Sequence, residues 1–204
     1  MKTTLHISLT SLVALSVLTL ASPPSAAAYD NADFVAPENE ALLVFIQNLY
    51  EDRTESFIVF DVDKQCVAEV GGRQAEVIPM KPGKHTLYIA SFRNQRIDID
   101  LAAGRTYFIR LNSIAKTSSR ATEVTLVQRR TESFKLVKTW LQGARVTHGR
   151  DDPCRGKPLK ERKNRIIRRI NDANAEWKNG DEIYRYRYML FQEDGLTASE
   201  VDWL

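Results

Sequence analysis

The chain contains few of the residues from which metal sites are built. Cys66 and Cys154 stand 88 positions apart, and His85 and His148 have no cysteine or carboxylate at metal-ligand spacing. A structural zinc site takes about four Cys or His ligands, so all of these residues would have to converge on one ion. Residues 61–63 (DVD) begin like a calcium loop, but the downstream glycine and glutamate are absent. We therefore predict no metal and no cofactor.

Short catalytic motifs are missing as well. The sequence contains no G-x-S-x-G, no phosphate-binding glycine loop and no dinucleotide fingerprint. Asp98 and Asp100 alternate with isoleucines, which places both carboxylates on one face of a strand. Such a pair could serve glycoside hydrolysis, which needs two carboxylates about 5–10 Å apart. A hydrolase with a scattered site of Asp98, Asp100 or His85 is therefore the alternative, and a non-catalytic protein is the prediction.

Long hydrophobic runs are confined to the first 28 residues. Lys2 supplies a positive charge, Leu9–Leu20 is apolar, and Ala26–Ala28 offers an A-x-A cleavage site. The apolar run spans only about 18 Å as a helix, too short for a hydrocarbon core of about 30 Å. We predict a signal peptide over residues 1–28, cleaved after Ala28, and a periplasmic or secreted protein. No cysteine follows the run, so a lipoprotein is not expected, nor is a later transmembrane segment.

Residues 39–130 are predicted to form an antiparallel β-sandwich of the immunoglobulin-like or transthyretin-like class. Turn residues such as Lys81-Pro82-Gly83 separate short apolar or alternating runs at a spacing of about ten residues, with no helical pattern between them. A short N-terminal extension, residues 29–38, comes before them. The predicted strands are residues 41–47, 57–63, 66–70, 74–78, 85–91, 97–101, 107–111 and 122–128.

Helical patterns begin only after the predicted strands. Apolar side chains at helical spacing predict an amphipathic helix over 131–145, which includes Trp140, and a linker over 146–158. Residues 159–204 are predicted to form a basic helix and a helical hairpin tail. The Tyr/Arg alternation near 184–188 would suit a strand equally well, so residues 181–193 stay open between helix and strand.

Two segments resemble a known family. The turn Lys81–Leu87 (KPGKHTL) is followed by Leu101–Leu111 (LAAGRTYFIRL). This pair resembles a family of exported bacterial envelope proteins, a domain of unknown function similar to PEGA-type domains. The resemblance implies a small transthyretin-like or immunoglobulin-like β-sandwich over about residues 39–130 and implies no activity. Many relatives are lipoproteins, and this sequence departs from them because it lacks the lipid-accepting cysteine.

The two cysteines could be free thiols or a disulfide. An oxidising compartment permits a bridge between Cys66 and Cys154, and we favour it. It would close a loop of about 88 residues, which the chain-entropy model values at about 4 kcal/mol. It would also fasten the helical tail to the β domain.

The charges form blocks along the C-terminal part of the chain. Residues 155–169 contain eight basic residues against Glu161 alone, whereas residues 172–204 are rich in acidic residues. The basic helix could bind lipid head groups or an acidic glycan. The favoured interpretation is a solvated helix whose charges face water or the acidic tail. The candidate anion-binding residues are Arg162, Lys163, Arg165, Arg168 and Arg169.

The sequence thus predicts a non-catalytic cell-envelope protein that interacts with a protein or a glycan through loops or an edge strand. Peripheral contact with an anionic membrane is the further alternative, and a nucleic-acid partner is not expected. Nothing in the sequence identifies the partner, the physiological role or the oligomeric state.

Overall fold

The computed structural model describes residues 29–48, 56–91, 94–116, 119–149, 154 and 159–204. For residues 114–116, 119–121 and 159–166 it describes the backbone only. The predicted signal peptide and most of the predicted linker therefore lie outside the described residues. In the described part of the chain, no helix is both long enough and apolar enough to cross a membrane.

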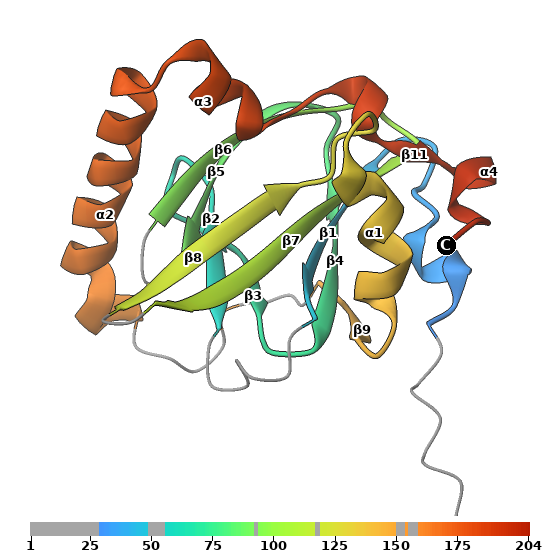
Figure 1. Ribbon diagram of the computed structural model, residues 1–204, viewed down its shortest axis with the longest axis horizontal. Helices are drawn as coiled ribbons and strands as arrows, with labels where there is room; N and C mark the ends of the chain where they lie inside the picture. Colours follow the sequence, from blue (N-terminus) through green and yellow to red (C-terminus); the bar gives the residue numbers. More distant parts are fainter. Residues whose placement is uncertain (1–28, 49–55, 92–93, 117–118, 150–153, 155–158) are drawn as a thin grey trace, which may run out of the picture.

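Two β-sheets face each other and enclose the main hydrophobic core (Figure 1). The six-stranded sheet has the order β11-β7-β1-β4-β9, with β8 paired to β7. The five-stranded sheet has the order β10-β6-β5-β2-β3. The strands of the first are β1 (Ala41–Gln47), β4 (Gln74–Met80), β7 (Arg105–Lys116), β8 (Ser119–Leu126), β9 (Arg145–His148) and β11 (Leu196–Thr197). The strands of the second are β2 (Phe57–Phe60), β3 (Cys66–Val70), β5 (Gly83–Ala90), β6 (Asn94–Leu101) and β10 (Met189–Leu190).

Strand β1 explains why one run of the sequence is apolar throughout. It pairs with β4 on one side and with β7 on the other, and every one of its residues is buried. Leu43 and Phe45 face the five-stranded sheet, whereas Val44 and Ile46 face a second core beneath α1. A strand buried on both faces has no need for alternation.

The predicted β-sandwich followed by a helical tail is confirmed, with two differences in detail. First, the pairs β1–β7, β4–β9 and β6–β10 are parallel, although an antiparallel sandwich was predicted. Second, Arg145–His148 form β9, which covers the last residue of the predicted helix and the start of the predicted linker. This strand is too short to show a period in the sequence, and its burial alternates only weakly.

Helices cover the outer face of each sheet. Helix α1 (Glu132–Leu141) packs on the six-stranded sheet through Val137, Trp140 and Leu141, as its predicted apolar face requires. Helix α2 (Leu159–Asn179) runs along the outer side of the five-stranded sheet (Figure 1). The short helices α3 (Glu182–Arg187) and α4 (Ala198–Val201) follow, and the 3₁₀ turns are η1 (Asn31–Phe34) and η2 (Gln192–Asp194).

The second half of α2 is held on one half of the five-stranded sheet. Ile170 and Ala173 are buried against a cluster that includes Tyr88. The Tyr88 hydroxyl donates a hydrogen bond of 2.9 Å to the Asn174 amide oxygen. The Arg96 guanidinium lies 4.8 Å from the centre of the Trp177 ring. These contacts use the C-terminal half of β5 and the N-terminal half of β6 and leave the other halves outside the helix contact.

The segment that the sequence left open between helix and strand contains both. Asp181 caps α3 by accepting a hydrogen bond of 2.7 Å from the Tyr184 N–H. Two residues then pair with β6 as β10, and the predicted helical hairpin is thus a short helix, a short strand and α4. Gly195 lies so close to the Tyr107 ring that a Cβ there would stand 2.6 Å from the ring carbon Cζ. Only glycine fits this contact without a shift of the backbone.

Arg129 ties this tail to the end of β8. Its guanidinium donates hydrogen bonds of 2.5 and 2.9 Å to the two carboxylate oxygens of Glu200, and its Nη2 also donates to the Gly195 carbonyl at 2.8 Å. Thr197 donates to Glu200 through its N–H and its hydroxyl, which forms a capping box at the start of α4. The bonds from Arg129, followed by that from the Thr197 N–H, lower the pKa of Glu200 from 4.5 to about 2.

Replacing Glu200 with Gln tests this bond through its pH dependence. Because the pKa of Glu200 is lower in the folded chain, the ion pair stabilises the fold fully above pH 4.5, and this stabilisation is lost as the pH falls through about 2. The Glu200 side chain is 36% exposed, so solvent screening limits the effect to about 1 kcal/mol. We expect Glu200→Gln to lower the thermal midpoint at pH 7 by about 2–4 °C. Calorimetry should show this difference shrinking between pH 4.5 and pH 2, and an undiminished difference at pH 2 would contradict the assignment.

Cys66 and Cys154 are paired as a disulfide, with their Cα atoms 6.2 Å apart. The bridge joins β3 to the segment just before α2. Cys154 is buried, and Cys66 packs beside the cluster in which α2 is anchored. The covalent bond and the docking of α2 therefore act on the same region of the five-stranded sheet.

Replacing both cysteines with serine should lower the free energy of unfolding by about 4 kcal/mol, because the unfolded chain would lose a closed loop of 88 residues. Chemical denaturation in oxidising buffer measures this difference. Dithiothreitol should lower the stability of the native protein toward that of the variant and leave the variant unchanged. A native protein that is insensitive to the reductant would show that the bridge contributes nothing.

Candidate functional site

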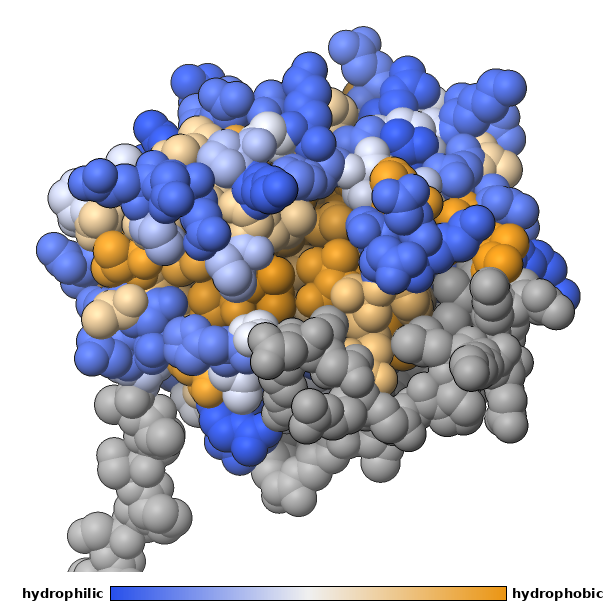
Figure 2. Space-filling model, turned by 180° about the vertical axis from the view of Figure 1, so that it is seen from behind, coloured by the Kyte–Doolittle hydropathy of each residue, from blue (hydrophilic) through white to orange (hydrophobic). Residues whose placement is uncertain are grey.

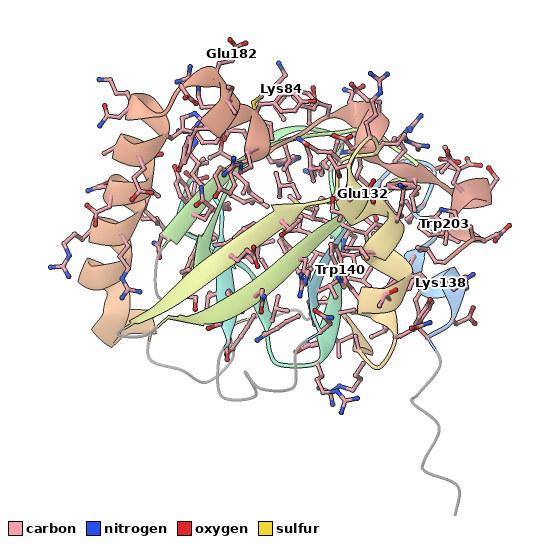
Figure 3. All side chains as sticks on the ribbon, in the orientation of Figure 1. Lys84, Glu132, Lys138, Trp140, Glu182 and Trp203 are labelled. Carbon is pink, nitrogen blue, oxygen red and sulfur yellow. A yellow bond between two sulfur atoms is a disulfide. The ribbon has the colours of Figure 1, made fainter. Side chains whose placement is uncertain are left out.

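A hollow of about 760 Å³ lies at the half of the five-stranded sheet that α2 leaves free. We call it the β5 hollow. Its lining comes from five strands and from two connecting segments. The residues are Lys84–Leu87 of β5, Asp98–Asp100 of β6, Met189 and Leu190 of β10 with the following Phe191, Asp61 and Val62 after β2, Val67 of β3 and Met80 of β4. Lys84 projects at the upper end of the molecule in Figure 3.

The hollow reaches the backbone of β5 because β2 is the shorter strand. Strand β2 has four residues and pairs with β5 only from Tyr88 to Ala90. The chain then turns back into β3, and the N–H of Asp61 donates to the Gln65 carbonyl at 3.0 Å to close the hairpin. The first half of β5, Gly83–Leu87, therefore has no strand on its β2 side among the described residues.

The register shows which backbone groups face this gap. The N–H of Asp98 donates to the Tyr188 carbonyl, so Asp98 points its backbone groups away from β5. Asp98 is opposite Thr86, and in an antiparallel pair both partners then direct N–H and C=O outward. By the same alternation Lys84 and Thr86 direct their N–H and C=O into the hollow. Among the described residues, no hydrogen bond to these four groups is found.

The polar candidates from the sequence all line this hollow, but they do not form one constellation. Asp98 and Asp100 share a face of β6, as predicted, and that face also contains Thr86. His85 lies on the opposite face with Leu87, and its ring nitrogen Nε2 lies 2.8 Å from the Lys81 carbonyl oxygen. The imidazole and the two carboxylates are thus separated by the sheet itself.

Both oxygens of Asp98 already accept hydrogen bonds. Arg96 binds them in a bidentate pair, at 3.0 Å from Nε and 2.9 Å from Nη2, and the Thr86 hydroxyl donates to Oδ1 at 2.8 Å. Asp100 accepts one exposed bond of 3.0 Å, from the Gln192 amide. Asp98 therefore belongs to the framework of the sheet that also places Arg96 against Trp177, whereas Asp100 lies at the rim of the hollow.

Apolar and aromatic side chains form the rest of the rim. Val62, at the tip of the β2–β3 hairpin, is 59% exposed. Phe191, which lines the hollow, packs against Tyr186 outside it with ring centres 5.4 Å apart, and Tyr186 is 56% exposed. Hydrophobic side chains also reach the surface on the rear of the molecule, where hydrophilic ones surround them (Figure 2). The sequence analysis singled out none of these apolar residues, because exposed apolar side chains on short elements show no period.

The structure describes only two of the five candidate anion-binding side chains of the basic helix. The side chains of Arg162, Lys163 and Arg165 lie outside the described residues. Arg168 is exposed, and Arg169 donates a hydrogen bond from Nη1 to the Ser91 carbonyl at the β5–β6 turn. Arg169 thus helps to hold α2 on the sheet, and the anion-binding role of the basic helix stays a prediction. In the described part of the chain, no three His, Cys, Asp or Glu side chains gather into a metal-binding group.

Asp98 and Asp100 form a matched pair for testing this assignment. Replacing Asp98 with Ala leaves Arg96 and Thr86 without their acceptor, so we expect a loss of about 1–3 kcal/mol in the free energy of unfolding. The same change at Asp100 removes one exposed contact and should stay within about 0.5 kcal/mol. Urea denaturation measures both values, and equal losses would show that Asp98 is not part of the framework.

Comparison with protein-family models gives no match for this chain. Comparison with curated proteins gives no match either. What the protein does has therefore to be inferred from the geometry of the β5 hollow, the groups that line it and the charges around them.

Proposed function

We propose that this protein is a non-catalytic interaction module of the bacterial cell envelope and that it binds a segment of another protein in the β5 hollow. The observation that carries the proposal is a hollow in which backbone groups of Lys84 and Thr86, for which the described residues supply no partner, lie among apolar side chains such as Val62 and Met189. Binding sites combine an apolar lining with a few polar groups that set orientation, in volumes of about 300–1,000 Å³.

The envelope location is the second part of the proposal. It rests on the charged start, apolar run and A-x-A site of residues 1–28. The Cys66–Cys154 disulfide supports it, because such bonds persist mainly in oxidising compartments. The protein would thus meet its partner after export, with its helices already fastened to the β domain.

A periplasmic hydrolase is the second candidate, because His85, Asp98 and Asp100 all line the same hollow. Two observations favour binding over hydrolysis. Acid–base catalysis needs its groups within reach of one substrate atom, and His85 lies across the sheet from the carboxylates. In addition, the Asp98 carboxylate is occupied by Arg96 and Thr86.

Two substitutions distinguish a functional hollow from a general apolar surface. Val62→Asp places a charge at the rim of the hollow, and Leu136→Asp places the same charge on α1, where Leu136 is 44% exposed. We expect crosslinking in intact cells, followed by capture and mass spectrometry, to recover one defined protein with the native chain and with Leu136→Asp. Val62→Asp should lose it, because a buried unpaired charge costs several kcal/mol.

The same experiment separates the alternatives. A partner that is kept by Val62→Asp but lost when Arg162, Lys163, Arg165, Arg168 and Arg169 become Gln would move the function to the basic helix. Release of the native protein from membranes by moderate salt would then indicate peripheral attachment to anionic lipid. A captured glycan instead of a protein would contradict the proposed partner class. If nothing is captured and a hydrolytic activity disappears with His85→Ala or Asp100→Asn, the protein is the hydrolase.

A further inference from the structure

We propose that the partner segment binds as an added β-strand beside the first half of β5, in the place that β2 leaves vacant. This inference rests on the proposed function and goes beyond it by naming the mode of recognition. In this mode the β5 hollow would bind the partner mainly through main-chain groups, and side-chain contacts would come second. Strand addition needs an exposed sheet edge with unpaired N–H and C=O groups, and Lys84 and Thr86 provide both.

The spacing of these groups fits a polypeptide backbone. Lys84 and Thr86 are two residues apart, so their N–H and C=O groups repeat at about 6.6–6.8 Å along the strand edge. An extended peptide presents complementary acceptors and donors at the same repeat. Sugar hydroxyls and lipid head groups do not present alternating N–H donors and C=O acceptors along one edge. The backbone groups of Lys84 and Thr86 therefore favour a protein segment over a glycan or a lipid as the partner.

The vacant place is bounded at both ends. On one side lies the tip of the β2–β3 hairpin, which is tied by the bond between Asp61 and Gln65. On the other side the chain crosses from β4 into β5, where Met80 lines the hollow and Lys81 accepts the contact from His85. Five residues of β5, Gly83–Leu87, lie between these ends. The place thus fits a short extended segment of about five residues.

The length of this place also argues against a second copy as the occupant. Strand β5 has eight residues, Gly83–Ala90, and it is framed by its own hairpin tip and crossover. A site five residues long accommodates a flexible or terminal segment of a different protein more readily than the longer strand of a second copy, which is fixed within its own sandwich. Successive side chains of such a segment point to opposite faces. One set would lie toward Val67 and Met80, and the other toward Thr86 and Asp98.

Thr86 offers a matched pair of substitutions. Its N–H faces the vacant place and takes no part in pairing with β6, so Thr86→Pro removes a donor for the partner without removing a bond of the β5–β6 ladder. Thr86→Val keeps the N–H and loses only the hydroxyl bond to Asp98. Circular dichroism and thermal unfolding establish that both variants fold.

The probe is a linear peptide selected from a random phage-displayed library on the disulfide-bonded protein and then synthesised. We expect Thr86→Pro to weaken its binding about tenfold or more, as the loss of a buried hydrogen bond requires, and Thr86→Val to change it about twofold or less. N-methylation of the peptide, one amide at a time, should weaken binding at every second position only. Hydrogen exchange of the Lys84 and Thr86 amides should slow when the peptide binds. The methylation series keeps the test valid even if Thr86→Pro does not fold.

The outcomes separate the two proposals. Peptides that lose binding with Val62→Asp but show no period of two on N-methylation would overturn strand addition and leave the proposed binding function standing. Peptides that bind Val62→Asp and the native protein equally would overturn both. A dimer of the protein on size-exclusion chromatography that Thr86→Pro dissociates and Thr86→Val preserves would identify a second copy as the occupant and overturn the assignment to a different protein.

Discussion

Backbone hydrogen bonding within the five-stranded sheet is the constraint on which the proposed activity depends. Every buried N–H and C=O must find a partner, and a sheet whose strands differ in length cannot pair them all. Strand β5 has eight residues, whereas its neighbour β2 has four. The side toward β6 is fully paired along the whole of β5. Within the described part of the chain, the unmatched half of β5 therefore has backbone groups without a partner on one side and a complete ladder on the other.

The helices determine which half of that sheet remains accessible. Helix α2 is held on the half that contains Tyr88 and Arg96, through Asn174, Trp177 and the buried Ile170. The disulfide acts close to the same contacts. The half of β5 that has no pairing with β2 lies beyond this contact. Helix α2 therefore stabilises the sheet without covering that half of β5. A rigid ladder beside free backbone groups is the arrangement that lowers the entropic cost of ordering a bound strand.

The sequence predicted the longer elements well and the shortest elements poorly. The eight runs between residues 41 and 128 and the apolar face of α1 predicted their elements, because apolar or alternating runs between turn residues indicate strands and helical spacing indicates an amphipathic helix. Strands β9, β10 and β11 have two to four residues, too few to show a period, and they pair with distant partners. The hollow was not predicted from the sequence either. His85, Asp98 and Asp100 were singled out for their chemistry, whereas the decisive feature, the early end of β2 opposite Tyr88, involves main-chain groups that every residue possesses.

The proposed strand addition would require no catalytic signature in the sequence. Recognition by strand addition depends on the length of β2 and on the bonds that fix the hairpin tip at Asp61 and Gln65, not on a particular side chain. Side chains then adjust specificity, as Val62 and Met189 can do from the rim. Selection on such a site acts on turn geometry and strand length. A hairpin lengthened by two residues after Phe60 would cover Thr86 with the protein's own strand, and the partner's binding site would disappear although every residue that lines the hollow was retained.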